Sequence, residues 1–325
     1  MMSAPSQPLD LLEAIAPELQ QTERLLNAAV ARVEPPLHSM LQQAVGGGKR
    51  LRAALVILVG QLFARPSAPF CALAAGIELL HAATLIHDDV VDQAPLRRGS
   101  PALHTRWSTP EAVLAGDYLL ARSTATVAEL GNCGLVQVLA NVLCTMSEGE
   151  IKQLPATQSV AAGREDYYRS IEAKAASLFA AAAEMAGMLA EAGSRQVAAL
   201  RRYGHELGLA FQIVDDVLDV IGDEALLGKP AGSDLRQGLV TLPVLCYFDI
   251  TANDAPVRAV LSGERDQAHV QAALEAIRSS GAITAALKEA QAHLNTGREA
   301  LLDLPDNAWR DMLGALADYV VGRRR

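Results

Sequence analysis

Long segments with apolar residues at helical spacing follow one another along most of the chain, and proline or glycine separates them. This spacing places the apolar side chains on one face of a helix, and proline and glycine are typical of helix ends. No segment shows the apolar–polar alternation between turns that is typical of a β-hairpin. The predicted helices are Leu11–Val33, Leu51–Phe63, Ala68–Val91, Glu111–Glu129, Gly134–Gln153, Arg164–Ala192, Ser194–Val220, Val240–Thr251, Asp266–Ser279, Ala282–Leu302 and Ala308–Val321. The pattern predicts an all-α protein, a single domain over residues 1–325 built as one large helical bundle.

The composition supports a helical core and limits the partners. Half of the residues are hydrophobic but only 4% are aromatic, so alanine, leucine and valine must build the core. Alanine and leucine are strong helix formers. The 28 basic and 37 acidic residues give a net charge of −9, which argues against a nucleic-acid-binding protein. An anionic small substrate is still compatible with this charge, because a metal ion can bridge two sets of negative groups.

Cysteines and apolar runs indicate the compartment. The four cysteines form no C-x-x-C pair, which predicts buried, reduced thiols and no zinc site. The first residues contain no basic region before an apolar stretch, so we expect no secretory signal. Unbroken apolar runs such as Ala53–Gly60 and Ser177–Ala183 are shorter than the roughly 18 residues that span a bilayer. We therefore expect a cytoplasmic protein without a transmembrane segment.

A D-D-x-x-D motif occurs twice, each time in an apolar helical segment. The two copies are Asp88, Asp89 and Asp92, and Asp215, Asp216 and Asp219. In each copy the first and last aspartates are four residues apart and share one helix face. On an exposed face such a pair costs only about 0.2–0.5 kcal/mol, so one copy alone is weak evidence for a site. The apolar neighbours predict partial burial, where the repulsion reaches about 3 kcal/mol. Two such carboxylate clusters predict bound hard cations, Mg²⁺ in particular.

Basic residues accompany both aspartate motifs. Lys49 and Arg52 follow three glycines at a predicted helix start, where backbone N–H groups and the helix dipole favour anions. A lone Lys174 on an alanine-rich face is also typical of a surface lysine, and His81 is also compatible with a core histidine. Long loops are predicted directly after each motif, over Asp92–Pro110 and Asp223–Leu239. Together these groups predict a pocket that binds more than one diphosphate.

The complete pattern resembles the trans-isoprenyl diphosphate synthase (polyprenyl synthetase) family, and most closely its octaprenyl and other long-chain members. The resemblance covers nearly the whole chain and is carried by Gly46–Arg52, Glu78–His81, His87–Asp92, Arg97–Gly99, Glu148–Glu150, Tyr203–Gly204, Leu207–Gln212, Asp215–Asp219, Leu227–Pro230, Asp234 and Thr241–Pro243. It implies the isoprenoid synthase fold, in which helices surround a central cavity, and a homodimer. It also implies several Mg²⁺ ions in each active site.

The resemblance further implies a reaction and a role for each matching residue. Isopentenyl diphosphate would attack an ionised allylic diphosphate, lengthening the product by one unit without an enzyme nucleophile. The metal ligands would be Asp88, Asp89, Asp92, Asp215, Asp216 and Asp219, supported indirectly by Asp234. Isopentenyl diphosphate would be held by Lys49, Arg52, His81 and Arg98. The allylic diphosphate would be held by Arg97, Lys174, Gln212 and Lys229. Lys174 and Lys229 would also take part in catalysis, together with the six aspartates.

The sequence departs from the family pattern at two further positions. The family often has threonine after the central lysine, where this chain has Ala175. It often has a second lysine before the T-L-P segment, where this chain has Leu239. Both changes remove a possible ligand of the allylic diphosphate. The metal-centred reaction requires neither group.

The residues before the first motif indicate the product length. Short-chain members often carry aromatic residues at the two positions occupied here by Ala83 and Thr84. Their small size favours a medium or long chain of about eight isoprene units, nearer the octaprenyl members than those that stop at three. The floor of the tunnel would then be deeper, among Leu114, Tyr118 or Met146. A short-chain farnesyl or geranylgeranyl synthase is the alternative, and a long product would pass to a membrane.

Two other functions fit parts of the pattern. A class I terpene cyclase shares a first D-D-x-x-D motif, but its second metal motif is usually not aspartate-rich and it needs no site for a second diphosphate. A non-catalytic partner subunit of a synthase usually loses aspartates, whereas this chain retains all six. An assay of the protein alone with Mg²⁺ distinguishes these functions from a synthase.

Overall fold

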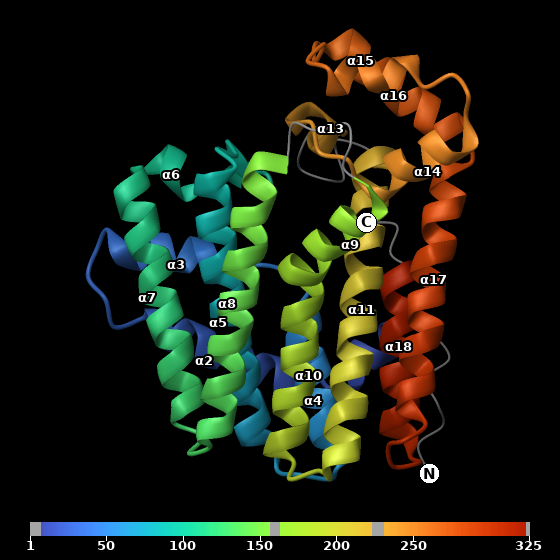
Figure 1. Ribbon diagram of the computed structural model, residues 1–325. Helices are drawn as coiled ribbons and strands as arrows, with labels where there is room; N and C mark the ends of the chain where they lie inside the picture. The colour runs from blue at the N-terminus through green and yellow to red at the C-terminus, as the bar shows by residue number, and fades with distance from the viewer. Residues whose placement is uncertain (1–7, 157–162, 223–230, 323–325) are drawn as a thin grey trace. The chain divides into compact units, whose positions relative to one another are not determined.

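A computed structural model of the chain describes residues 8–156, 163–222 and 231–322 (Figure 1). The all-α prediction is confirmed, since the regular elements of the described residues are helices apart from one hairpin of two short strands. The elements are α1 (Pro8–Ala14), α2 (Ala16–Val30), α3 (Leu37–Val45), α4 (Leu51–Leu62), α5 (Ser67–Val91), β1 (Leu96–Arg97), β2 (Ser100–Pro101), α6 (Leu103–Arg106), α7 (Thr109–Ala128), α8 (Cys133–Ala156), α9 (Arg164–Ile171), the π-helical turn η1 (Glu172–Ala176), α10 (Ser177–Leu189), α11 (Ser194–Ile221), α13 (Ser233–Gln237), α14 (Leu242–Ile250), α15 (Ala255–Leu261), α16 (Gln267–Ser279), α17 (Ala282–Leu301) and α18 (Ala308–Gly322).

The helices gather into two compact units, each made of segments that are distant in the sequence. The first unit comprises Met1–Asn141, Ala181–Arg201 and Ala300–Leu316. The second unit comprises Val142–Ala180, Arg202–Glu299 and Ala317–Arg325. The first aspartate motif lies in the first unit and the second motif in the second. A single domain over residues 1–325 stays a prediction.

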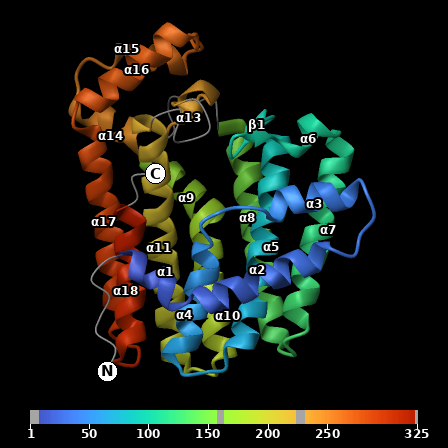
Figure 2. The same ribbon diagram turned by 180° about the vertical axis from the view of Figure 1, so that it is seen from behind.

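Helix α5 is the centre of the first unit and packs against α2, α4 and α7 (Figure 2). Its contact with α7 is close because Gly76 has no side chain: a Cβ there would lie 2.8 Å from Val127. At the same place the Ser123 hydroxyl donates a hydrogen bond of 2.7 Å to the Gly76 carbonyl. Because its surroundings hold α5 on several sides, they also fix the aspartate motif at its C-terminal end.

Among the described residues, α5 is also the one helix that is long and apolar enough to cross a membrane. Its apolar window has a mean hydropathy of 1.6, and 72% of that window is buried inside the protein. A core helix passes the same test, and the burial of α5 matches that explanation. The sequence criterion of unbroken apolar runs missed this helix, because single polar residues such as Glu78 and His81 interrupt the runs.

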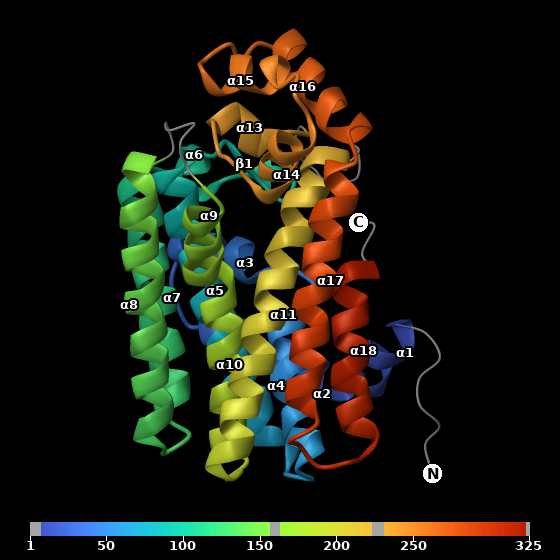
Figure 3. The ribbon, with the colours of Figure 1, turned by 45° about the vertical axis from the view of Figure 1, so that its right-hand side comes forward.

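In the second unit, α11 lies close to η1 and α10 (Figure 3). Gly204 and Gly208 are four residues apart on one face of α11. A Cβ at Gly208 would lie 2.5 Å from the Ala176 Cα atom, and one at Gly204 would lie 2.4 Å from the Phe179 carbonyl oxygen. These two glycines therefore bring the backbone of α11 against the segment that carries Lys174.

Several predicted helix bounds need correction. The predicted helix Leu11–Val33 is two helices, because Pro17 occupies the first turn of α2 and proline starts helices more readily than it continues them. The predicted helix Arg164–Ala192 contains the π turn and ends at Leu189. The short helices α3, α13 and α15 were not predicted, since each has too few residues to show a helical period. The predicted loop after the first motif contains the hairpin and α6.

The four cysteines are free. Cys71 and Cys246 are buried, as expected. The expectation of burial is wrong for Cys133 and Cys144, which are exposed on α8. Apolar residues lie on the exposed face of this helix as well as on its buried face. The apolar neighbours of the two cysteines in the sequence therefore did not indicate on which face each thiol lies.

Candidate active site

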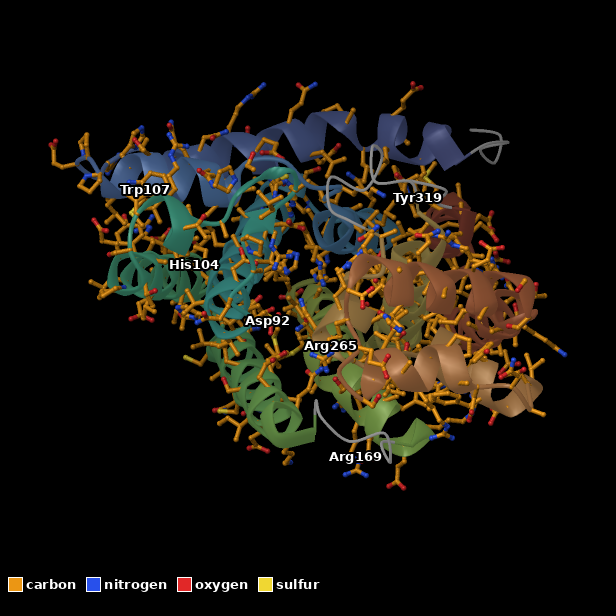
Figure 4. The ribbon with its side chains drawn as sticks, turned by 90° about the horizontal axis from the view of Figure 1, so that it is seen from above. Asp92, His104, Trp107, Arg169, Arg265 and Tyr319 are labelled. Carbon is orange, nitrogen blue, oxygen red and sulfur yellow. The ribbon has the colours of Figure 1, made fainter. Side chains whose placement is uncertain are left out.

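The first aspartate motif forms the C-terminal end of α5 (Figure 4 labels Asp92). Asp88 is half-buried, Asp89 is only 4% exposed, and Asp92 is the exposed C-cap residue, whose N–H donates to the Asp88 carbonyl at 2.8 Å. Arg97 donates to one Asp89 carboxylate oxygen through Nε at 2.8 Å and also through Nη2. The buried Asp89 carboxylate is thus neutralised by a cation from the hairpin that follows the motif.

That hairpin places two arginines in different directions. Arg97 ends β1, and Arg98 and Gly99 form the two-residue turn with positive φ values of 51° and 75°. Such a turn matches the twist of the strands it joins. Arg98 Nη1 donates to the Gly46 carbonyl at 2.9 Å, so its guanidinium lies at the glycine-rich loop. The hairpin therefore connects the aspartate motif with the predicted anion-binding loop.

Behind the glycine-rich loop, an ion-pair network fixes the start of α4. Arg50 has a left-handed backbone conformation (φ 51°) and donates to Glu23 Oε1 at 2.5 Å, to Glu78 Oε2 at 3.2 Å and to the Val45 carbonyl at 2.6 Å. The other Glu78 oxygen accepts the Ala53 N–H at 3.2 Å, inside the first turn of α4. The network joins α4 to α5, and so joins the segment that carries Lys49 and Arg52 to the helix that carries His81.

The environment of His81 is positively charged. Its removal from solvent lowers its pKa well below the usual value, and the charges of Arg52, Arg98 and Arg97 lower it further. Lys49 is exposed at the loop, whereas Arg52 is buried. Cations gathered around a neutral imidazole repel one another, and an anion such as a diphosphate relieves that repulsion. The structure thus brings together three of the predicted isopentenyl diphosphate residues, His81, Arg52 and Arg98.

The second aspartate motif lies inside α11 and is more deeply buried. Asp215 is half-buried, and Asp216 is 4% exposed. Asp216 accepts hydrogen bonds from the Gln212 amide at 2.8 Å and from the Tyr167 hydroxyl at 2.7 Å. Burial raises the pKa of Asp216 well above its usual value, and the charge of Asp234 raises it further.

Helix α13 contacts the last aspartate of this motif. The Ser233 hydroxyl donates to Asp219 Oδ1 at 2.7 Å, and the Asp234 N–H donates to Oδ2 at 3.1 Å. The Gly232 N–H donates to the Asp219 carbonyl at 2.8 Å. Asp234, which was predicted to support the metal site indirectly, therefore touches the motif through its backbone. Leu239, one of the two departures, donates its N–H to the Asp234 carbonyl at 2.9 Å.

Lys174 lies on the π turn η1, and its Nζ is 3.2 Å from Glu150 Oε1 on α8. The approach depends on Gly149, where a Cβ would lie 2.3 Å from the Ala173 Cβ. Single π turns inside α-helices are frequent at functional sites. Ala175, the other departure, is buried beside Lys174. Lys229, which was predicted to bind the allylic diphosphate, lies outside the described residues.

The residues predicted to shape the product tunnel differ in burial. Ala83 is buried in an apolar cluster of the first unit that also contains Ala115 and Leu119. Tyr118 packs against this cluster, and Thr84 is half-buried with its hydroxyl on the His81 carbonyl at 2.9 Å. Leu114 is 64% exposed, which does not fit a tunnel floor in the single chain. Met146, in the second unit, is buried.

Sequence reasoning assigned no role to four residues that fix these groups: Arg50, Glu150, Tyr167 and Ser233. Arg50 and Glu150 lie in segments that carry the family resemblance, whereas nothing in the sequence singled out Tyr167 or Ser233. None of them is part of an aspartate motif, and each acts on a partner from another element. Their roles follow from tertiary packing, for which the sequence gives no periodic signal.

The donors of both motifs fit a hard divalent cation. Carboxylate oxygens predominate, and Mg²⁺ typically takes one or two carboxylates and completes its shell with water and substrate phosphate. Among the described residues, no group of three or more His, Cys, Asp or Glu side chains is arranged to hold a metal ion. A cation shared with a diphosphate does not need such an all-protein cage.

Comparison with known proteins gives consistent matches over the chain. A family described as Polyprenyl synthetase matches residues 34–277. Heptaprenyl diphosphate synthase component 2 of Geobacillus stearothermophilus is 38% identical over 311 residues, 95% of this chain and 97% of the relative. Nonaprenyl diphosphate synthase of Mycobacterium tuberculosis is 36% identical over 313 residues, 92% of this chain and 93% of the relative. The crystal structure of polyprenyl synthase from Caulobacter crescentus CB15, complexed with calcium and isoprenyl diphosphate, has a TM-score of 0.92 at 34% identity and covers 100% of both chains.

Proposed function

This chain belongs to the polyprenyl synthetase family and is a prenyltransferase, and from that premise we propose that it adds isopentenyl diphosphate to an allylic diphosphate. The observation that carries the proposal is the cationic group around His81, which lies in the same unit as a complete aspartate motif. A condensation of two diphosphates needs a cationic site for one and a metal-dependent site for the other. A terpene cyclase would need no site for a second diphosphate.

Mg²⁺ would be held by Asp88, Asp89 and Asp92 of the first motif and by Asp215, Asp216 and Asp219 of the second. When bound, the ions would stabilise the charge of the departing pyrophosphate. The calcium in the related Caulobacter structure supports a divalent cation for this family. Asp234 would contribute through its backbone bond to Asp219.

The basic residues would bind and orient the two substrates. Lys49, Arg52, His81 and Arg98 would hold isopentenyl diphosphate, and the lowered pKa of His81 leaves its imidazole neutral, as a hydrogen-bonding group. Arg97, Lys174, Gln212 and Lys229 would hold the allylic diphosphate. The allylic C–O bond breaks and pyrophosphate leaves with the electron pair. The double bond of isopentenyl diphosphate then forms the new C–C bond, and loss of a proton restores a double bond.

The product is a trans-polyprenyl diphosphate of medium or long chain, about eight isoprene units. The names of the relatives, heptaprenyl and nonaprenyl diphosphate synthase, lie on either side of that length. The small side chains of Ala83 and Thr84 support it, because neither position carries an aromatic ring.

The oligomeric state and the compartment belong to the same proposal. We expect a homodimer in the cytoplasm that passes its hydrophobic product to a membrane. One relative is named as component 2 of a heptaprenyl diphosphate synthase, so assembly with a second kind of chain is the competing arrangement. Light scattering of the purified chain distinguishes a dimer from a monomer that needs another component.

The proposal is tested with the purified protein alone. It is incubated with Mg²⁺, isopentenyl diphosphate and either farnesyl or dimethylallyl diphosphate, and mass spectrometry gives the length of the prenyl products. We expect products of about eight units, and none after chelation of the metal. Products of only three or four units would support the proposed reaction but contradict the proposed chain length. No elongation from either primer would overturn the proposed activity of the chain alone.

A further inference from the structure

Tyr167 contacts the second aspartate motif from another element. Its hydroxyl lies 2.7 Å from Asp216 Oδ2, and the Gln212 amide lies 2.8 Å from Oδ1. Both Asp216 and Tyr167 are buried. Since a carboxylate accepts and a phenol donates, each oxygen of Asp216 is held by a different donor. Gln212 comes from α11 itself, whereas Tyr167 comes from α9.

The helix that carries Tyr167 is itself anchored on a second side. Tyr168 donates to Glu289 Oε2 of α17 at 2.7 Å. Arg164 donates to Glu289 Oε1 at 2.5 Å and to Asp249 Oδ2 at 2.7 Å. Because successive residues of a helix point about 100° apart, Tyr167 and Tyr168 reach α11 and α17 respectively. Tyr167 is therefore a donor in a fixed place and not a mobile surface group.

We propose that Tyr167 is a positioning residue for the metal-dependent diphosphate site: its hydroxyl fixes the rotation of the Asp216 carboxylate. The inference rests on the proposed function of the second motif. Tyr167 is placed to act on Asp216, not on the substrates. The π turn that carries Lys174 directly follows α9, so the same helix sets the start of the segment that carries a predicted diphosphate ligand.

The substitution Tyr167→Phe tests the hydroxyl alone, because phenylalanine retains the ring and its edge contact with Tyr168, at 5.4 Å between centroids. Tyr168→Phe is the matched control: it removes the neighbouring hydroxyl from Glu289 and leaves Asp216 untouched. Loss of a group that orients a metal ligand typically weakens metal affinity about 10–100-fold. The probe is Mn²⁺ with inorganic pyrophosphate. Electron paramagnetic resonance measures the concentration of free Mn²⁺ and so gives the affinity of the protein for the ion.

We expect Tyr167→Phe to weaken Mn²⁺ binding by at least about tenfold and Tyr168→Phe to change it less than about twofold. The thermal midpoints of the two variants should be similar. In the turnover assay Tyr167→Phe should raise the KM for the allylic diphosphate more than that for isopentenyl diphosphate. Equal Mn²⁺ affinity in Tyr167→Phe and wild type would overturn the inference, as would an equal loss in both variants.

A double-mutant cycle separates positioning from general packing. If Tyr167 acts through Asp216, then Tyr167→Phe should not weaken Mn²⁺ binding further in an Asp216→Asn background. An additive loss would contradict the inference, even if both variants were less stable than wild type. A wild-type protein that neither binds Mn²⁺ with pyrophosphate nor elongates a primer would instead count against the proposed function.

Discussion

The two aspartate motifs have the same residues at the same spacing but different partners. In the first unit, the buried Asp89 accepts hydrogen bonds from Arg97, a cation. In the second unit, the equally buried Asp216 accepts hydrogen bonds from Tyr167 and Gln212, which are neutral. The first motif also ends its helix, whereas the second lies inside one.

This difference shows that the same sequence motif can place its buried carboxylate beside a cation in one copy and beside neutral donors in the other. A neutral donor satisfies an oxygen lone pair but leaves the charge of the carboxylate in place. Burial raises the pKa of Asp216 and the Asp234 charge raises it further, so both disfavour the charged form of Asp216. A cation bound with the substrate should therefore stabilise the second region more than the first, where Arg97 already neutralises Asp89.

The largest effect should come from removing one carboxylate charge from either motif. We expect Asp88→Asn and Asp215→Asn each to lower kcat by about 10²–10³-fold, the usual cost of losing one group that stabilises transition-state charge. The loss should be greater for Asp215→Asn, whose region has the neutral donors. Steady-state turnover measures both. The exposed Asp311→Asn on α18 is the control, and either motif variant that keeps more than a tenth of wild-type activity would contradict the prediction.

The ion pair behind the glycine-rich loop should give the largest effect on stability. Glu78 is 5% and Arg50 12% exposed, so Arg50→Met leaves a buried carboxylate without its cation. Breaking such a pair costs about 3–5 kcal/mol of unfolding free energy. Urea unfolding measures the loss. Arg65→Met is the matched control, since Arg65 and its partner Glu191 are 40% and 78% exposed and such pairs contribute about 0–1 kcal/mol. Equal losses of unfolding free energy in the two variants would contradict the prediction that the buried ion pair contributes more to stability than the exposed one.

The loss of unfolding free energy should depend on salt for a variant at the first motif but not for one at the second. Arg97 is 38% exposed, so Arg97→Gln should cost less than a fully buried pair, roughly 1–3 kcal/mol at low salt, and the cost should decrease in 1 M salt. The cost of Tyr167→Phe should be independent of salt, because the lost donor is neutral. Urea unfolding of both variants at two salt concentrations measures this. If both costs decrease equally with salt, the contrast between a charged and a neutral partner is wrong.

The helices and both motifs were predictable from sequence because they depend on local patterns. Apolar spacing gave α5 and α11, and a spacing of four placed Asp88 with Asp92 and Asp215 with Asp219 on shared faces. Family resemblance added the basic residues, of which the structure places Arg52, Arg97 and Arg98 around His81 and Lys174 on η1. Their roles in binding stay predictions.

The partners of the buried carboxylates were not predictable, because they depend on which helices pack together. Gly204 and Gly208 bring α11 against the segment with Lys174, but two glycines in a helix do not reveal their neighbour. Tyr167 has no local signal, since its partner is 49 residues away. The π turn depends on a backbone geometry that the alanine-rich sequence does not specify. Leu114 was one of three residues predicted at the tunnel floor, yet it is exposed.

The smallest effect concerns His205, a histidine of α11. His205 lies 3.5 Å from Glu206 and 3.5 Å from Glu172. The hydrogen bond with Glu206 raises the pKa of His205. Burial alone would raise the pKa of Glu206, but hydrogen bonds from His205 and His293 lower it to about 2, so Glu206 stays ionised at neutral pH.

The pH dependence follows from the direction of this shift. Because the folded pKa of His205 exceeds the unfolded value of about 6.5, its contribution to stability is complete below pH 6.5 and is lost as the pH rises through the folded pKa. His205→Asn should therefore lower the thermal midpoint by about 1–3 °C at pH 6 and have little effect at pH 9. Differential scanning fluorimetry against wild type in the same buffers measures both values. An equal decrease at the two pH values would mean that His205 stabilises the second unit by packing and not by charge, and the second region would then contain no charge-dependent partner at this position.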